Sequence, residues 1–135
     1  MTITNEPRLV QPKDFRGLRW GALMPTDLDI CYDHHGLCWV LGELKVRGTP
    51  LPEGQQLAYT RLCEDVTAGG REVLFLIAEH RTEPPRAIDV ARCMVRKYWW
   101  GGSWHPLLDE QGETYRTVLD MFNHIIKRVE RGLVK

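Results

Sequence analysis

The chain has 135 residues, of which 43% are hydrophobic and 27% are charged. This is typical of one soluble globular domain that can bury a core without disulfide or metal staples. The 18 basic and 18 acidic side chains cancel, which excludes a polycation, so a nucleic-acid partner would have to be bound by local basic clusters. Such clusters are Arg92, Arg96 and Lys97, and Lys127, Arg128 and Arg131.

The expected location of the protein follows from two features of the sequence. No apolar run is long enough to cross a bilayer, and the N-terminus lacks the basic-then-apolar order of a secretory signal. We therefore expect a cytoplasmic protein with no membrane partner. In that compartment the four cysteines are expected to be free and mostly buried thiols.

The predicted elements begin after a polar N-terminal segment. Residues 1–14 contain two prolines and no hydrophobic period, which predicts a loose arm or an edge element. Residues 18–23 form a weak predicted strand. In residues 27–32 acidic and apolar side chains alternate, which predicts a strand with the acids on one face. Residues 33–36 supply a turn, and residues 37–46 return as a second strand.

The length of this turn determines which residues face each other across the hairpin. A three-residue turn over residues 34–36 pairs Asp27 with Glu43 and places Asp29 one diagonal away on the same face. A two-residue turn would separate the acids from Glu43. The three-residue turn also collects apolar side chains on the other face, namely Leu28, Ile30, Tyr32, Cys38, Val40 and Leu44.

A helix is predicted for residues 53–66, because polar and apolar residues recur there at helical spacing. One face consists of Gln55, Tyr59, Leu62 and Val66. Gln55 on such a face needs a polar partner, which the neighbouring acids supply. Gln56 is off this face and is expected to be solvated.

The second half of the chain supplies the rest of the sheet. Residues 73–78 are all apolar, which predicts a central strand covered on both faces. Residues 87–98 predict a strand nearer the edge, and residues 99–104 a Gly-rich turn with three exposed or half-buried indoles. Residues 118–129 predict an amphipathic helix that packs on the sheet. Together these elements predict a single α/β domain, residues 1–135, with a central mixed sheet of four to five strands flanked by helices.

The acids and the lysine of the hairpin predict a metal site. Asp27, Asp29 and Glu43 would repel one another unless a cation lay between them. Oxygen-only ligands favour Mg²⁺ or Mn²⁺. Lys45 lies two residues beyond Glu43, on the same side of the strand, where it can orient water or neutralise charge on a phosphate. These residues indicate phosphodiester hydrolysis.

A second set of potential ligands lies at the hairpin turn. Cys31, His34, His35 and Cys38 resemble a zinc set, but all four fall within eight residues. One short hairpin does not easily wrap four ligands tetrahedrally, because structural zinc sites usually recruit two separated pairs. We therefore do not expect this set to bind zinc.

The motifs of the hairpin and helix resemble those of the PD-(D/E)XK nuclease superfamily. They are Thr26-Asp27-Leu28-Asp29, Gly42-Glu43-Leu44-Lys45, and Gln55 with Tyr59. The helical motif is similar to that of nuclease domains in bacterial recombination exonucleases, and small stand-alone proteins of this pattern occur in phages and prophages.

The resemblance implies a restriction-endonuclease-like core and assigns a role to each motif residue. Either Asp27 or Asp29 would be the metal-binding aspartate and Glu43 the second acid. Lys45 would be the catalytic lysine, and Gln55 with Tyr59 would form the helical motif. The protein would be a DNA endo- or exonuclease dependent on Mg²⁺ or Mn²⁺, in a bacterium or a phage-infected cell, and a homodimer is a further expectation.

Two alternatives to a nuclease are open. The same fold could serve as a catalytically silent module that binds nucleic acid or assembles with other proteins, stacking bases on the indoles, Trp104 included. The other alternative is an α/β domain in which Glu43 and Lys45 form only a surface ion pair. The residues expected to contact nucleic acid are Arg47, Arg96, Lys97, Trp99 and Trp100.

Overall fold

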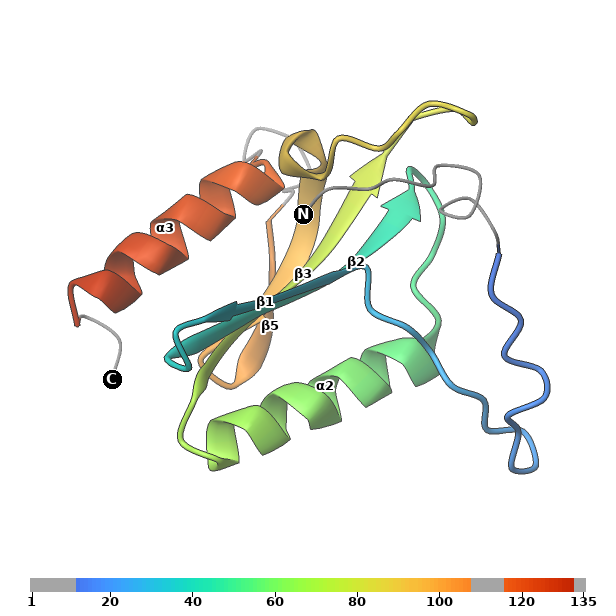
Figure 1. Ribbon diagram of the computed structural model, residues 1–135, viewed down its shortest axis with the longest axis horizontal. Coiled ribbons are helices and arrows are strands. Elements are labelled where there is room, and N and C mark those ends of the chain that lie inside the picture. Colours follow the sequence, from blue (N-terminus) through green and yellow to red (C-terminus); the bar gives the residue numbers. More distant parts are fainter. Residues whose placement is uncertain (1–11, 108–115, 133–135) are drawn as a thin grey trace.

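A five-stranded mixed sheet lies between two helices in the computed structural model, which describes residues 12–107 and 116–132 (Figure 1). The strands, in their order across the sheet, are β1 (Ile30–His34), β2 (Cys38–Val46), β3 (Glu72–His80), β4 (Met94–Trp100) and β5 (Ser103–Pro106). The helices are α2 (Glu53–Ala68) and α3 (Val118–Glu130), with a short 3-10 turn at Val90–Arg92. The predicted α/β fold with a mixed sheet of four to five strands is confirmed.

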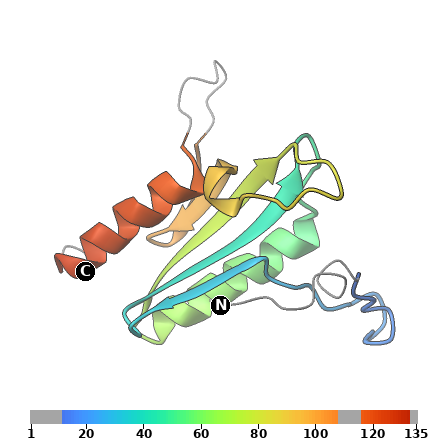
Figure 2. The ribbon, with the colours of Figure 1, turned by 45° about the horizontal axis from the view of Figure 1, so that its top comes forward.

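The two helices cover opposite faces of the sheet (Figures 1 and 2). Strands β2 and β3 run parallel, and α2 makes the crossover between them, as a parallel pair requires. On the α2 face the core contains Tyr59, Phe75 and Ile77, and on the α3 face it contains Leu76 and Met121. Strand β3 is therefore covered on both sides, as its unbroken apolar run predicts. Among the described residues, no helix has the length and apolar character of a membrane span.

The hairpin of β1 and β2 has a register two residues away from the expected one. His34 pairs with Cys38 and Ile30 with Gly42, so the loop is residues 35–37. Left-handed φ angles at His35 and Gly36 make this tight turn, and Leu37 remains exposed instead of joining the strand. Because the shift is even, each side chain keeps its predicted face.

The shifted register changes which aspartate lies beside Glu43. Asp29, not Asp27, directly precedes the last strand pair, Ile30 with Gly42, and contacts both neighbours of Glu43 on β2. The backbone N–H of Asp29 donates to the carbonyl of Gly42 at 3.0 Å. Asp27 lies before the strand, and Leu28 is exposed instead of packing on the apolar face.

Three other predicted elements differ from the structure. Residues 18–23 contain only a bridge between Trp20 and Leu23, both exposed, because none of the described strands pairs with them. The predicted strand of residues 87–98 starts only at Met94, after the 3-10 turn. The predicted turn of residues 99–104 is mostly strand, because Gly101 and Gly102 alone, with φ of +63° and +98°, connect β4 to β5.

The four cysteines are free, as expected, and three of them are buried. Burial raises the pKa of the Cys38 thiol to about 11 and that of Cys63 to about 12. These thiols therefore remain protonated at neutral pH and act as small apolar core residues.

Candidate functional site

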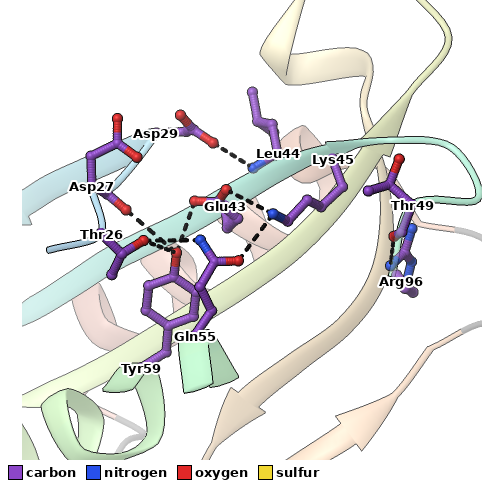
Figure 3. A network of polar contacts seen from close by, with 10 residues as sticks. All are labelled: Thr26, Asp27, Asp29, Glu43, Leu44, Lys45, Thr49, Gln55, Tyr59 and Arg96. Atoms are coloured by element: carbon purple, nitrogen blue, oxygen red, sulfur yellow. Dashed lines mark hydrogen bonds and ion pairs between the residues drawn. The ribbon is translucent and has the colours of Figure 1, made fainter. Parts of the chain in front are cut away.

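Three carboxylates meet where the chain enters β1 and crosses β2 (Figure 3). Asp27, Asp29 and Glu43 each offer one oxygen, and these oxygens lie within 4.8 Å of one another. The two aspartates are exposed, but Glu43 is only 6% exposed. The structure thus brings together the three residues that the sequence predicts as metal ligands.

Asp29 is held against β2 on both sides of Glu43. Its backbone N–H donates to Gly42, and its Oδ2 accepts a hydrogen bond of 2.8 Å from the backbone N–H of Leu44. Gly42 is also required by packing, since a Cβ there would lie 2.8 Å from the Ile30 side chain and 3.0 Å from the carbonyl of Leu76. The close approach of β1, β2 and β3 therefore fixes the position of Asp29 relative to Glu43.

The buried carboxylate of Glu43 is supported from helix α2 by Tyr59. The Tyr59 hydroxyl donates to Glu43 Oε2 at 2.9 Å. The ring of Tyr59 is 1% exposed and packs on Phe75 with a centroid distance of 4.4 Å. Burial raises the pKa of Tyr59, which keeps this hydroxyl protonated as a donor.

The pKa of Glu43 lies above its ordinary value. Burial is the main cause, and the negative charge of Asp29 adds to it. The hydrogen bond from Tyr59 and the charge of Lys45 act in the opposite direction. Glu43 is therefore a carboxylate whose charge lacks full compensation from its protein neighbours.

Lys45 lies between the acids and the first turn of α2. Its Nζ is 3.5 Å from Glu43 Oε1 and donates a hydrogen bond of 3.0 Å to Gln55 Oε1. The side chain of Lys45 is 16% exposed, so its ammonium group is directed into the site instead of extending into solvent. Gln55, Tyr59 and Lys45 converge on Glu43 as Figure 3 shows.

Thr26 closes this set of contacts into a ring and was not among the predicted site residues. Gln55 Nε2 donates to Thr26 Oγ1 at 2.9 Å, and Thr26 Oγ1 lies 3.4 Å from the Tyr59 hydroxyl. Lys45 thus donates to Gln55, Gln55 to Thr26 and Tyr59 to Glu43. The contact between Thr26 and Tyr59 and the ion pair between Glu43 and Lys45 close the ring. The signal in the sequence was the hydroxyl residue directly before Asp27.

Two arginines, Arg96 on β4 and Arg47 directly after β2, gather around Glu79 of β3. Glu79 accepts hydrogen bonds from Arg96 at 2.9 and 3.2 Å, and the Arg47 guanidinium lies 3.8 Å away from it. A cavity of about 330 Å³ adjoins this cluster and includes Arg47 in its lining, but not the three carboxylates.

Lys97 of β4 lies on the face of the sheet that α2 covers, and it contacts this helix. Its Nζ donates to Gln56 Oε1 and lies 5.6 Å from the centre of the Trp104 ring. Burial, together with the nearby Arg96, lowers the pKa of Lys97. Gln56 is therefore half-buried and bonded, not solvated as predicted. The buried face of α2 also differs, since Leu62 is exposed and Cys63 is buried in its place.

The tryptophans do not form the predicted contact surface. Trp99 is 2% exposed within the core on the α2 face, so its indole has no open face on which a base could stack. Trp100 packs on the opposite, α3 face, away from the carboxylates. Trp104 is half-buried and donates to Thr60 at 2.8 Å. The alternation of side chains along β4 separates Trp99 from Trp100.

The donor set suits a hard divalent cation. All three ligands are carboxylates, and two of them are open to solvent, so water and a phosphate oxygen could complete the coordination. A cation there would also compensate the buried charge of Glu43. The residues present therefore fit Mg²⁺ or Mn²⁺.

Comparisons of the chain with protein-family models, with curated proteins and with solved structures find no match. The functional interpretation therefore depends on the geometry of the site.

Proposed function

We propose that this protein is a nuclease that hydrolyses phosphodiester bonds in DNA with the help of Mg²⁺ or Mn²⁺. The observation that carries the proposal is the grouping of Asp27, Asp29 and Glu43, with oxygens within 4.8 Å of one another, beside Lys45. Glu43 and Lys45 are both largely withdrawn from solvent. This burial favours a role for the pair in phosphoryl chemistry over the alternative of a simple surface ion pair.

The arrangement also supports the finer fold assignment, a restriction-endonuclease-like core of the PD-(D/E)XK type. The aspartates lie at β1, Glu43 and Lys45 on β2, and Gln55 with Tyr59 on the following helix. Contacts between Gln55 and Lys45 and between Tyr59 and Glu43 join the motifs that the resemblance groups together.

A divalent ion bound by the three carboxylates would supply Lewis-acid polarisation of the phosphate and would acidify water. Lys45 then has a defined task, since its charged Nζ can hold the attacking water or stabilise negative charge that develops on the phosphate oxygens. Gln55 fixes Lys45 by accepting one of its three N–H groups, and two N–H groups remain for Glu43 and the substrate.

Tyr59 and Thr26 are positioning residues. Tyr59 holds Glu43 Oε2, which leaves Oε1 facing Lys45. Thr26 accepts from Gln55, which orients the Gln55 carbonyl oxygen toward Lys45. Because Thr26 precedes Asp27 directly, the same contact ties the segment of the aspartates to α2.

The experiment is a cleavage assay with labelled single-stranded, double-stranded and branched DNA, with Mg²⁺ or Mn²⁺ and with a chelator. We expect metal-dependent cleavage that falls about a hundred- to thousandfold in Lys45→Met and disappears in Glu43→Gln. Lys13→Met is the matched control, because Lys13 is an exposed lysine outside the site and outside both basic clusters. Equal cleavage by the wild type and both site variants would contradict the proposal. DNA binding without cleavage would favour the silent binding module instead.

A further inference from the structure

We propose that His34, His35 and Glu130 form a second metal site, for a divalent transition ion such as Zn²⁺. Each residue offers one ligand atom, and the three atoms lie within 4.8 Å of one another. His34 and His35 end β1 and begin its turn, and Glu130 is the last residue of α3. The site lies on the α3 face of the sheet and is independent of the proposed nuclease.

The donor set differs from that of the three carboxylates. Imidazole nitrogen binds Zn²⁺ and similar ions in preference to Mg²⁺. Two histidines and one carboxylate, with a position left for water, are a recurrent donor set for zinc. The two cysteines near the turn do not take part, because neither belongs to this group of ligand atoms.

His34 is already oriented as a ligand. Its ring is 7% exposed and contacts Glu130 through Nε2, and its Nδ1 lies 2.8 Å from the Tyr32 hydroxyl. In the tautomer that donates from Nδ1 to Tyr32, the ring offers an unprotonated Nε2 to a metal ion held with Glu130. Metal-binding histidines commonly have such a fixed second nitrogen. Without a metal the same ring can donate from Nε2 to Glu130 and accept at Nδ1 from Tyr32, and a bound cation would take the place of the Nε2 proton.

Glu130 and His35 complete the site from the solvent side. Glu130 is placed at the C-terminal end of α3, where the helix dipole disfavours a negative charge and favours a bound cation. His35 adopts a left-handed φ of +53°, which brings its ring within 4.8 Å of the His34 ring centre to centre. Donor atoms about 3.4 Å apart, as bonds of about 2.1 Å at a tetrahedral centre require, can be reached by rotation of these two exposed side chains.

Such an ion would tie the hairpin to the end of the last helix. His34 and Glu130 are 96 residues apart in the chain, and the hairpin tip and the C-terminal end of α3 lie toward the same side in Figures 1 and 2. Zn²⁺ would therefore stabilise the folded chain in addition to any effect of Mg²⁺ on the other face.

The test is a calorimetric titration of chelator-treated, full-length protein with Zn²⁺ in excess Mg²⁺, with Co²⁺ as an optical probe of nitrogen ligation. We expect one Zn²⁺ per chain and a rise in melting temperature. Both should be lost in His35→Gly and in Glu130→Gln. Glycine suits the left-handed φ at position 35, so His35→Gly keeps the turn. Tyr32→Phe should weaken binding about tenfold.

Two controls locate the ion. His124→Ala removes an exposed histidine of α3 outside the group, and Asp29→Asn disables the carboxylate group. Both should keep full Zn²⁺ binding. The proposal is overturned if the wild type binds no Zn²⁺, if His35→Gly and Glu130→Gln bind as tightly as the wild type, or if only Asp29→Asn loses the ion.

Discussion

The Tyr59 hydroxyl donates a 2.9 Å hydrogen bond to Glu43 Oε2 across the interface between α2 and the sheet. Both side chains are buried, Tyr59 at 1% and Glu43 at 6% exposure. The bond satisfies an acceptor that burial would otherwise leave costly, and it fixes the carboxylate that lies between Asp29 and Lys45. Packing of α2 thereby determines the geometry of the carboxylate group.

Replacing Tyr59 by Phe tests this relationship. We expect the free energy of unfolding to fall by about 1–3 kcal/mol, because buried Glu43 loses its donor. The hydrogen bond lowers the pKa of Glu43, so its loss should raise that pKa and move the acid limb of the cleavage rate to higher pH. Urea denaturation and a pH–rate profile measure the two effects. Tyr98→Phe, on the α3 face, should change neither, and an unchanged profile in Tyr59→Phe would contradict the role of Tyr59.

Binding of Mg²⁺ should depend more on Asp29 than on Asp27. Asp29 is anchored to β2 on both sides of Glu43 by hydrogen bonds to the backbone of Gly42 and Leu44, and Asp27 lies two residues farther from β1. At a hundred times its dissociation constant, Mg²⁺ should stabilise the wild type by about 2.7 kcal/mol. Asp29→Asn keeps the acceptor for Leu44 and should lose nearly all of this gain.

Thermal denaturation with and without Mg²⁺ makes the comparison. Asp27→Asn should lose only part of the stabilisation, and Glu64→Gln, on the exposed side of α2, should keep all of it. Equal stabilisation of the wild type and Asp29→Asn would exclude Asp29 as a ligand.

The pH dependence of stability without metal should report the buried charge of Glu43. Burial raises its pKa above the ordinary 4.5. Between 4.5 and that higher value the folded protein holds a proton that the unfolded chain has released, so stability falls as pH rises through this window. Glu43→Gln should remove this component of the slope. Denaturant titrations of both proteins at several pH values measure it, and parallel curves would show that Glu43 is not perturbed.

Arg47 and Arg96 should respond differently to replacement by Ala. The Arg47 side chain is 52% exposed, and its contact with Glu79 is 3.8 Å long, so it is available to a phosphate. Arg47→Ala should weaken DNA binding and reduce the dependence of log K on log salt by about one. Fluorescence anisotropy over a salt series measures this effect, and an unchanged slope would exclude a phosphate contact by Arg47.

Arg96 is instead engaged within the protein. It binds Glu79 twice and donates to the carbonyl of Thr49 at 2.9 Å. Arg96→Ala should lower the free energy of unfolding by about 1–3 kcal/mol, because the 13% exposed Glu79 loses its main partner. Unaltered stability in urea would contradict this structural role.

Local sequence pattern predicted the hairpin, the helix of Gln55 and Tyr59, the central strand and the C-terminal helix. Alternation of side chains assigned faces in the hairpin correctly, because face depends only on whether a shift is odd or even. It did not give the register. The left-handed conformation of His35 and the exposure of Leu37 shift the turn by one residue along the chain, from residues 34–36 to residues 35–37. The same pattern could not show that Trp99 is buried. Residues 99–104 were predicted as a wide turn, but in the structure only Gly101 and Gly102 form the turn, so Trp99 belongs to strand β4.

By itself the sequence determined which residue types the hairpin and helix present, because spacing along one element fixes which side chains share a face. Only the tertiary structure decided that Asp29 lies beside Glu43, that Thr26 joins Gln55 to Tyr59, and that Glu130 reaches His34. These contacts join elements far apart in the chain. They depend on strand register and on how each helix is seated, which packing of the whole core sets and which no local pattern encodes.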